Sequence, residues 1–318
     1  MRNPGGVLSN LLRRAATGVR DLALVTLATT TVLFFLIRLT GDPSVMIAGE
    51  SATPAQLAQV RAAYGFDRSL IEQYLVYAGK VLHFDMGVSL QDGQSAIHKV
   101  LQAYPATLML AAAAITANIV ISVPIGAWLG QSRGAAARVV RIALNVLQGM
   151  PGFVSALLLV NIFAVGLGWL PSVGYGRPET LILPVVSVVS FMAPKLIRVI
   201  EANTSAALRS NFVRTARSIG ASNRQILWRH VLPNALLGAI ALIGAEIAAM
   251  LTGLVIIETI FAWPGIGWLL VQSTLNLDFP VVQAIALVMV VSVFLANAAT
   301  EALQTLADPR LRTKGRPE

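Results

Sequence analysis

The sequence predicts an all-α integral membrane protein with six transmembrane helices and with both termini in the cytoplasm. Its composition supports this fold class, because 56% of the 318 residues are hydrophobic and only 12% are charged, whereas globular domains contain about 25% charged residues. A further observation is that six segments reach the roughly 20 apolar residues needed to cross a bilayer. The composition is therefore wrong for an ordinary soluble domain.

The six expected spans follow one another along the whole chain. They are residues 19–39, 105–130, 139–166, 180–200, 232–257 and 280–307. The basic stretch 1–18 and the apolar run behind it resemble a signal peptide in outline, but the run is long and no small-residue cleavage pattern follows it. We therefore expect residues 1–18 to be a cytoplasmic N-terminal segment and residues 19–39 to be an uncleaved first span.

Residues 40–104 are expected to form an extracytoplasmic loop that contains short helices. Thr53 and Pro54 are an N-cap and first-turn pair, and they predict a helix over 54–64. A second helix is predicted over 69–82. Four of its residues share one face at helical spacing: Leu70, Tyr74, Tyr77 and Val81. Such short amphipathic helices are expected to lie on the membrane or on the other spans.

Residues 105–307 are expected to form a core of five spans that includes a cytoplasmic segment at 201–231. Residues 308–318 are the expected cytoplasmic tail. Most of the 24 lysines and arginines lie in the termini and in the segments that join alternate spans, which the positive-inside rule assigns to the cytoplasm. The two short outer loops carry Arg177 as their only basic residue. This bias accounts for the net charge of +9 without a nucleic-acid partner.

The segment 201–231 is cationic and lies between two long apolar runs. Four apolar residues recur at helical spacing and predict one amphipathic helix: Leu208, Phe212, Ala216 and Ile219. Gly220 suits the left-handed residue that ends a helix. Ser222, with Gln225 three residues later, is a capping-box signature for a second short helix. The sequence therefore predicts two short helices at an angle.

Three interpretations of this helix pair compete. In the first, the pair rests on anionic lipid headgroups, and each Arg adds about 1 kcal/mol to membrane binding. In the second, it is a DNA-binding helix-turn-helix. In the third, it docks a cytoplasmic protein, and the small residues at its corner allow close approach. DNA binding is the weakest, because a segment tethered at both ends to membrane spans leaves no room for the rest of such a domain. Composition alone leaves lipid and protein docking open.

The segment and its continuation resemble the cytoplasmic coupling loop of the membrane subunits of ABC importers. The pattern in that family is E-A-A, three residues, Gly, nine residues, a hydrophobic position, one residue and Leu-Pro. Counted from Gly220, the Leu-Pro falls on Leu232 and Pro233, and Thr215 and Ala216 occupy the two alanine positions. The form "VRTAR…G" resembles the branch that contains dipeptide, oligopeptide and nickel permeases. Similarity continues in "GDPSVMIAGE", "LQAYPATLMLA", "ETIFAWPGIGWLL", "DFPVVQAIALV" and the terminal "DPRLR".

The resemblance implies a type I ABC importer permease fold in a bacterial cell membrane. It also implies a role as permease subunit of an ATP-driven di- or oligopeptide importer, with nickel chelates or glutathione as alternative substrates. The implied partners are a homologous second permease, two cytoplasmic ATP-binding subunits, an extracytoplasmic substrate-binding protein and membrane lipid, but no nucleic acid. The residues implied to contact the ATPases are Phe212, Arg214, Thr215, Ala216, Arg217, Ile219, Gly220, Ala221 and Ser222. A self-sufficient secondary transporter or channel is the alternative.

The chain is not expected to be an enzyme by itself. It has no G-x-x-x-x-G-K-[ST] motif, so we expect ATP and Mg²⁺ to be bound by the partner ATPase subunits. No local motif marks a catalytic nucleophile. The chain has no cysteine, and its three histidines lack metal-ligand spacing. We therefore expect no catalytic residue, no cofactor and no metal site in this chain.

Two features inside the expected spans bear on packing and transport. Gly126 and Gly130 form a small-xxx-small pair, which is either a helix-packing face or a chance occurrence. Glu246 lies near the middle of the fifth span, where a charged side chain is costly and faces protein or water rather than lipid. It either lines the translocation pathway and favours a cationic group, such as a peptide amino terminus, or is a structural carboxyl at a helix interface.

The stretch that follows the fifth span combines aromatic and turn-forming residues. The residues concerned are Trp263, Pro264, Gly265 and Gly267. Such a combination suits either an interfacial belt that anchors the protein at the outer membrane surface or a re-entrant outer gate. Anchoring is the favoured interpretation.

Overall fold

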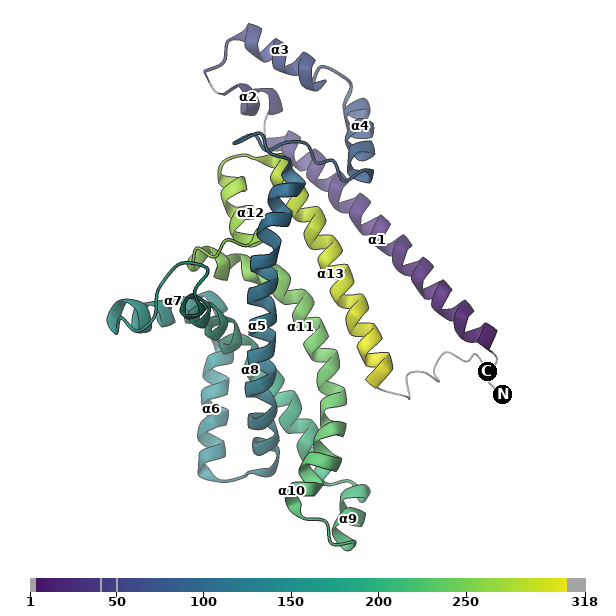
Figure 1. Cartoon of the computed structure of the whole chain (residues 1–318), viewed down its shortest axis with the longest axis vertical. Coiled ribbons are helices and arrows are strands. Elements are labelled where there is room, and N and C mark those ends of the chain that lie inside the picture. Colours follow the sequence, from purple (N-terminus) through teal and green to yellow (C-terminus); the bar gives the residue numbers. More distant parts are fainter. Residues whose placement is uncertain (1–3, 41, 50, 308–318) are drawn as a thin grey trace. The chain divides into compact units, whose positions relative to one another are not determined.

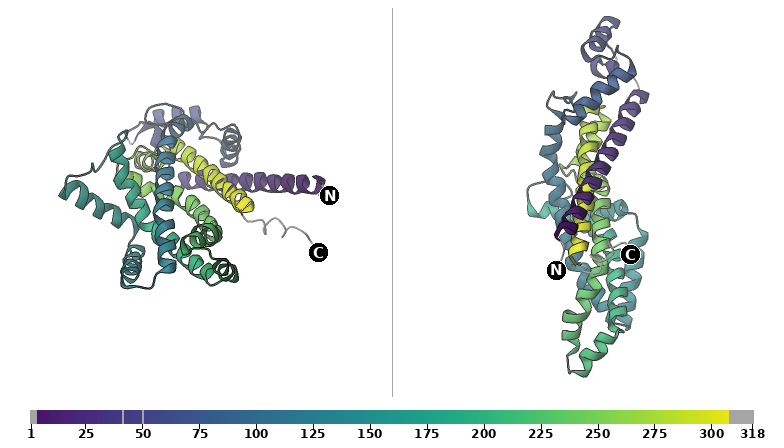
Figure 2. Two further views of the ribbon diagram at one scale, coloured as in Figure 1. Left: turned by 60° about the horizontal axis from the view of Figure 1, so that its bottom comes forward. Right: turned by 90° about the vertical axis from the view of Figure 1, so that its right-hand side faces the viewer.

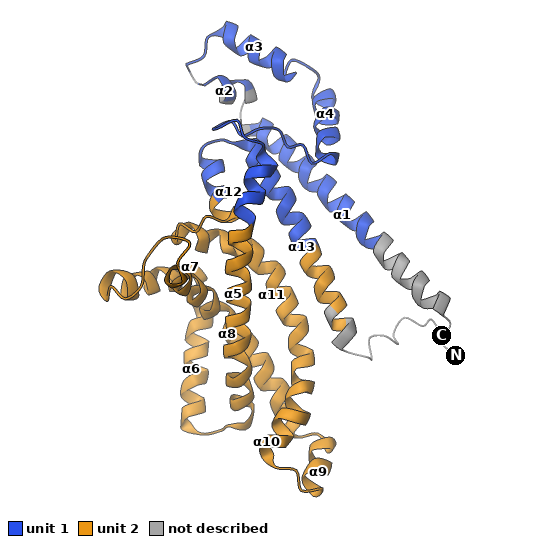
Figure 3. Ribbon diagram, in the orientation of Figure 1, with its two compact units in different colours: residues 1–104, 269–294 blue, residues 105–268, 295–318 orange. Residues whose placement is uncertain are grey.

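The computed structural model describes residues 4–40, 42–49 and 51–307, and these are almost entirely helical (Figure 1). The expected cytoplasmic tail 308–318 lies outside the described residues. The chain divides into two compact units, which Figure 3 shows in different colours. One unit comprises residues 1–104 and 269–294, and the other residues 105–268 and 295–318.

The first unit contains the N-terminal helices. They are α1 (Pro4–Thr40), α2 (Pro43–Ala48), α3 (Pro54–Tyr64) and α4 (Leu70–Leu82). A capping box begins α3 at Thr53 and another begins α4 at Ser69, so both short helices expected in this region are confirmed. The helix α4 packs against α1, with 5.4 Å between the ring centroids of Tyr74 and Phe34. Of the predicted face, Leu70 is exposed rather than packed.

The remaining helices follow in chain order. They are α5 (Ala96–Gln131), α6 (Ala135–Gly149), α7 (Gly152–Leu159), the π-helical η1 (Val160–Gly166), α8 (Pro178–Leu208), α9 (Asn211–Ser218), α10 (Asn223–Gln225), the π-helical η2 (Ile226–Val231), α11 (Leu232–Ile260), α12 (Ile266–Leu275) and α13 (Phe279–Ala307). In the second unit, α8 lies beside α11 (Figures 1 and 2).

Within the described part of the chain, five helices are long and apolar enough to cross a membrane. They are Thr17–Leu39, Ala96–Gln131, Pro178–Leu208, Asn223–Ile260 and Phe279–Ala302. The expected span 139–166 is not one straight helix, because the chain bends by 106° between Gly149 and Gly152. Met150 has an extended backbone, as expected for a residue before a proline, and Pro151 has no N–H to continue the helix. The number of spans is therefore six if this bent pair counts as one.

The glycine pair in α5 is a packing face, which decides between the two interpretations offered by the sequence. A Cβ added to Gly126 would lie 2.8 Å from side-chain atoms of Ile200, and one added to Gly130 would lie 2.7 Å from Thr204. Both partners belong to α8. The missing side chains thus let α5 approach α8 closely.

We expect Gly126→Ala to destabilise the chain by about 1–3 kcal/mol, because the added methyl group overpacks the contact with α8. The backbone oxygen of Ile197, 2.9 Å from that position, cannot rotate away. The matched control is Gly253→Ala in α11, where nothing lies within 4 Å and better helix propensity stabilises by up to about 1 kcal/mol. Thermal unfolding of the purified variants checks this, and equal midpoints for the two would contradict it.

Candidate functional site

The segment 201–231 folds around a small hydrophobic core of its own. Val213 and Ala216 of α9 are buried against Ile226 and Val231 of η2. The eight-residue α9 cannot be stable by itself, so this core holds it beside the longer helix. The segment is therefore a folded corner rather than a loose loop.

The turn of this corner has the predicted capping. Gly220 has φ +81°, which is the left-handed conformation that favours glycine. The Ser222 N–H donates to Gln225 Oε1 at 3.0 Å, and the Ser222 hydroxyl accepts from the Gln225 N–H. The second helix is not short, however, because the chain remains helical from Asn223 to Ile260. The π-helical η2 ends at Val231, two residues before Pro233.

The predicted apolar stripe of α9 is only partly correct. Ala216 is buried as expected, but Phe212 is 41% exposed and Ile219 is 79% exposed, while Val213 occupies the interior instead. Val213 and Ala216 are also spaced i, i+3, so the sequence contained two overlapping stripes. Which of them faces inward depends on η2, because Ile226 packs on the inner one.

The expected docking residues therefore divide by exposure. Those that are exposed are Phe212, Arg214, Thr215, Arg217, Ile219, Gly220 and Ser222. Ala216 is buried and Ala221 is half-buried, so both support the corner from inside. Phe212, Thr215 and Ile219 lie at spacings of three and four, which places them on one side of the helix. We call these three residues the exposed α9 face.

Trp228 is a surface residue of this segment that sequence reasoning missed. Its side chain is 53% exposed. With Ser222, Arg224, Gln225 and Arg229 it lines a hollow of about 320 Å³. The signal was available in the sequence, because a tryptophan between arginines next to a capping box is typical of an interaction surface.

Glu246 lies in α11 with an incompletely satisfied carboxylate. Only 8% of the residue is exposed. One oxygen, Oε1, is 3.9 Å from Lys195 Nζ of α8. The other, Oε2, is buried and accepts no hydrogen bond from any described residue. The site therefore retains the capacity to accept a hydrogen bond from a cationic group.

A second buried carboxylate, Glu258, was not singled out from the sequence. It is fully buried and accepts three hydrogen bonds: from Thr107 Oγ1 at 2.7 Å, from the Gly267 N–H at 2.7 Å and from the Trp268 N–H at 3.1 Å. Thr107 Oγ1 accepts in turn from the Ile266 N–H at 2.8 Å. Glu258 and Thr107 together accept hydrogen bonds from the first N–H groups of α12, which is the role of an N-cap residue.

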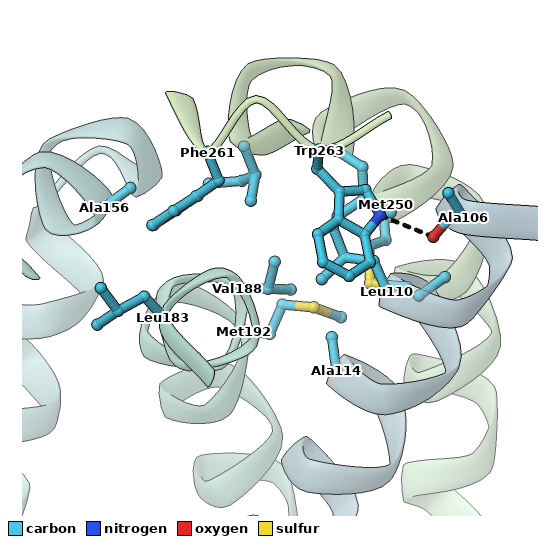
Figure 4. Close-up of a cluster of buried hydrophobic side chains, with 13 residues drawn as sticks. Ala106, Leu110, Ala114, Ala156, Leu183, Val188, Met192, Met250, Phe261 and Trp263 are labelled. Carbon is cyan, nitrogen blue, oxygen red and sulfur yellow. Dashed lines mark hydrogen bonds between the residues drawn. The ribbon is translucent and has the colours of Figure 1, made fainter. Parts of the chain in front are cut away.

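Trp263 is a core residue of the second unit, and this corrects the favoured interpretation of an interfacial anchor. It is 1% exposed. Its indole Nε1–H donates to the Ala106 carbonyl at 2.8 Å, beside Leu110 and Met250 (Figure 4). The backbone N–H of Trp263 donates to the Glu258 carbonyl at 2.8 Å. Buried indole N–H groups need such a partner.

The two glycines of this stretch are required by close approach rather than by flexibility. A Cβ on Gly265 would lie 2.4 Å from the carboxylate of Glu258, and a Cβ on Gly267 would lie 2.5 Å from Val255 Cα. Pro264 joins them to Trp263. The stretch 261–268 is thus packed tightly over the end of α11.

The described residues contain no group of three or more His, Cys, Asp or Glu side chains that could hold a metal ion. The features with spare interaction capacity in the second unit are the exposed α9 face with the hollow at Trp228, and the Glu246 carboxylate. The first has the composition of an interaction surface, and the second retains an acceptor oxygen that no described residue fills.

Residues 122–313 match the family described as binding-protein-dependent transport system inner membrane component, and residues 7–111 match the N-terminal part of such membrane components. The oligopeptide transport system permease protein OppB of Haemophilus influenzae is 32% identical over 287 residues, which are 89% of this chain and 93% of that relative. The glutathione transport system permease protein GsiC of Escherichia coli (strain K12) is 30% identical over 285 residues, with the same coverages.

Solved structures show a similar fold at lower identity. A chain of the MetNI methionine ABC transporter in an inward-facing conformation superposes with a TM-score of 0.57 at 19% identity, covering 66% of this chain and 96% of that chain. An amino acid ABC transporter determined with histidines gives a TM-score of 0.51 at 18% identity, covering 67% of this chain and 94% of that chain.

Proposed function

Because the chain belongs to the family of binding-protein-dependent transport system inner membrane components, we propose that it is the permease subunit of an ATP-driven peptide importer. It has the type I fold of ABC importer permeases and is a multi-pass inner membrane protein. Peptide as the substrate is supported by the names of relatives, one an oligopeptide and one a glutathione permease. Glutathione and nickel chelates are the alternative substrates within the same function.

The proposed assembly contains this chain and a homologous second permease, which share one translocation pathway. Two cytoplasmic ATP-binding subunits bind ATP and Mg²⁺, and an extracytoplasmic binding protein delivers the substrate. In this assembly, residues 40–104 lie on the extracytoplasmic side of the membrane and residues 201–231 on the cytoplasmic side. The proposal is tested by screening the cognate binding protein against peptides, glutathione and nickel chelates. Binding of none of the three classes would contradict it.

The observation that carries the coupling role is the folded corner at 201–231. Its internal core makes it rigid enough to transmit a displacement, and the exposed α9 face presents apolar groups that no described residue covers. We propose that the ATPases bind Phe212, Thr215 and Ile219 together with the hollow at Trp228. Closure of the ATPases then moves the corner and shifts the spans between inward-open and outward-open states.

The sequence suggested that the small residues at the corner allow a partner to approach closely. The contact proposed here is instead centred on the exposed α9 face. Ala216 is buried in the segment's own core, so it sets the position of α9 rather than touching a partner. Gly220 remains accessible, because no atom lies within 4 Å of where its Cβ would be. Arg214 and Arg217 are exposed on the opposite side of α9 from the exposed α9 face, at two and five residues after Phe212, and suit acidic residues of a partner that reaches that side.

We also propose that Glu246 faces the pathway and binds the amino terminus of a peptide. Its free Oε2 supports this role. Glu246→Gln is expected to weaken uptake of peptides with a free amino terminus about tenfold, since a charge-assisted hydrogen bond contributes about 1.5–3 kcal/mol. Uptake of N-acetylated peptides is expected to stay unchanged. Initial rates over a range of peptide concentrations measure both.

The control for this substitution is Glu179→Gln. It removes the same charge from an exposed position in the first turn of α8 and is expected to leave both substrates unaffected. If Glu246→Gln lowers uptake of free and acetylated peptides equally, Glu246 is a structural carboxyl and the pathway role is wrong.

The stretch 261–268, packed over the end of α11, is proposed as part of the outer gate.

A further inference from the structure

The first unit contains a cavity of about 600 Å³ that has no part in the proposed coupling or transport pathway. It is bordered by the end of α1, by α3 and α4, and by the beginning of α13. Its lining combines aromatic and cationic side chains, among them Phe34, Arg38, Arg68, Tyr77, Lys80 and Phe279. A cavity with an apolar wall and a few convergent polar groups is the usual form of a small-molecule site.

The charge of the lining is mostly positive. Three cations, Arg38, Arg68 and Lys80, are accompanied by one acidic residue, Asp85. Arg38 is held in place, since its guanidinium lies 3.4 Å from the centroid of the Phe34 ring and donates to Gln73 Oε1 at 2.8 Å. Among the described residues, neither Arg68 nor Lys80 forms an ion pair. The cavity is therefore suited to an anion.

Tyr77 contributes a buried hydroxyl that no described residue satisfies. Burial raises the pKa of Tyr77 to about 12, so the hydroxyl stays protonated and remains a donor. An unpaired buried hydroxyl is costly unless something binds to it. Tyr77 belongs to the lining that contains the three cations, with its hydroxyl enclosed behind the cavity surface.

The cavity lies where the first span ends. Arg38 is in the last turn of α1, one residue before the end of the span Thr17–Leu39. Phospholipid phosphates lie at that depth of a bilayer. On α4, the side chains of Ile71, Leu75 and Leu82 are 73%, 63% and 80% exposed. At spacings of four and seven they form one apolar side, which suits contact with lipid.

We propose that this cavity binds the headgroup phosphate of an anionic phospholipid. Arg68 and Lys80 contact the phosphate beside the fixed guanidinium of Arg38. The glycerol and the first part of the acyl chains lie against Phe279. By contacting all three helices, the lipid would stabilise the packing of α4 and of the beginning of α13 against the end of α1.

The test compares lipids added to the purified full-length chain in detergent, with the midpoint of thermal unfolding as the readout. Phosphatidylglycerol is expected to raise the midpoint, and phosphatidylcholine is expected to raise it much less. Each cation near a lipid surface changes the affinity about fivefold, so Arg68→Gln with Lys80→Gln is expected to weaken the apparent affinity for phosphatidylglycerol about 20-fold.

Arg177→Gln is the matched control, because it removes an exposed arginine from the other unit and is expected to leave the response intact. Equal stabilisation by phosphatidylcholine and phosphatidylglycerol would overturn the proposal. So would a full response in the double variant, whose changes are at exposed positions and do not prevent folding. Glycerol phosphate is expected not to compete, and competition at the concentrations at which the lipid binds would overturn the assignment to a lipid.

Discussion

Ile219→Asp is expected to abolish ATP-driven uptake while leaving the chain folded. Ile219 is 79% exposed at the end of α9, so the native fold of the chain does not depend on burying it. In the proposed complex the residue is buried against an ATPase subunit. Truncating or charging a central apolar anchor of an interface costs about 2 kcal/mol or more, which is a loss of roughly 30-fold in the affinity for the ATPases. Transport assays with the assembled complex measure the effect.

Two companion variants make this result interpretable. Ile219→Leu retains the apolar surface and is expected to keep uptake near the wild-type level. Val213→Asp places a charge in the core of the segment, where Val213 is fully buried, and is expected to unfold the corner and reduce the amount of protein in the membrane. Normal amounts of Ile219→Asp together with normal ATP-dependent uptake would show that the exposed α9 face does not couple the ATPases.

Glu258→Ala is expected to lower the stability of the second unit by about 3–5 kcal/mol. The change leaves three donors without an acceptor: the N–H groups of Gly267 and Trp268 and the hydroxyl of Thr107. Each buried group left without a partner costs about 1–3 kcal/mol. The removed side chain also leaves a cavity between α11 and the beginning of α12. Unfolding of the purified chain by heat or denaturant checks the value.

Glu258→Gln separates hydrogen bonding from charge. Its amide oxygen can still accept from Gly267 and Trp268, and its NH₂ group can donate to Thr107, so a loss of about 1–2 kcal/mol is expected. The control is Glu179→Ala at an exposed position, for which a change within about 0.5 kcal/mol is expected. If Glu258→Ala were no more destabilising than this control, the network at the beginning of α12 would not hold the stretch 261–268.

The sequence predicted those parts of the fold that depend on interactions between residues close together in the chain. The N-cap at Thr53, the capping box at Ser222 and the left-handed Gly220 depend on residues within four positions of one another, and the structure confirms them. The apolar spans were predicted for the same reason, since crossing a bilayer requires a continuous apolar run. The family resemblance then supplied the arrangement of these elements, which residue spacing did not.

The errors came from contacts between residues far apart in the chain. Glu258 and Thr107 are separated by 151 positions, so nothing in either local sequence shows that they are partners. Trp263 was assigned to a membrane surface because aromatic residues near span ends often lie there, whereas its partner is the Ala106 carbonyl, 157 positions away. Of the two stripes on α9, the inner one was decided by Ile226 on the other helix of the segment.

The most direct test of the central claim is peptide uptake by proteoliposomes that contain this chain with the second permease, the two ATPase subunits and the binding protein. We predict that labelled peptide accumulates only when ATP and Mg²⁺ reach the ATPases, and that omitting the ATPases abolishes accumulation. Accumulation at an unchanged rate without ATPase subunits would contradict the account, because the chain would then be a self-sufficient secondary transporter or channel.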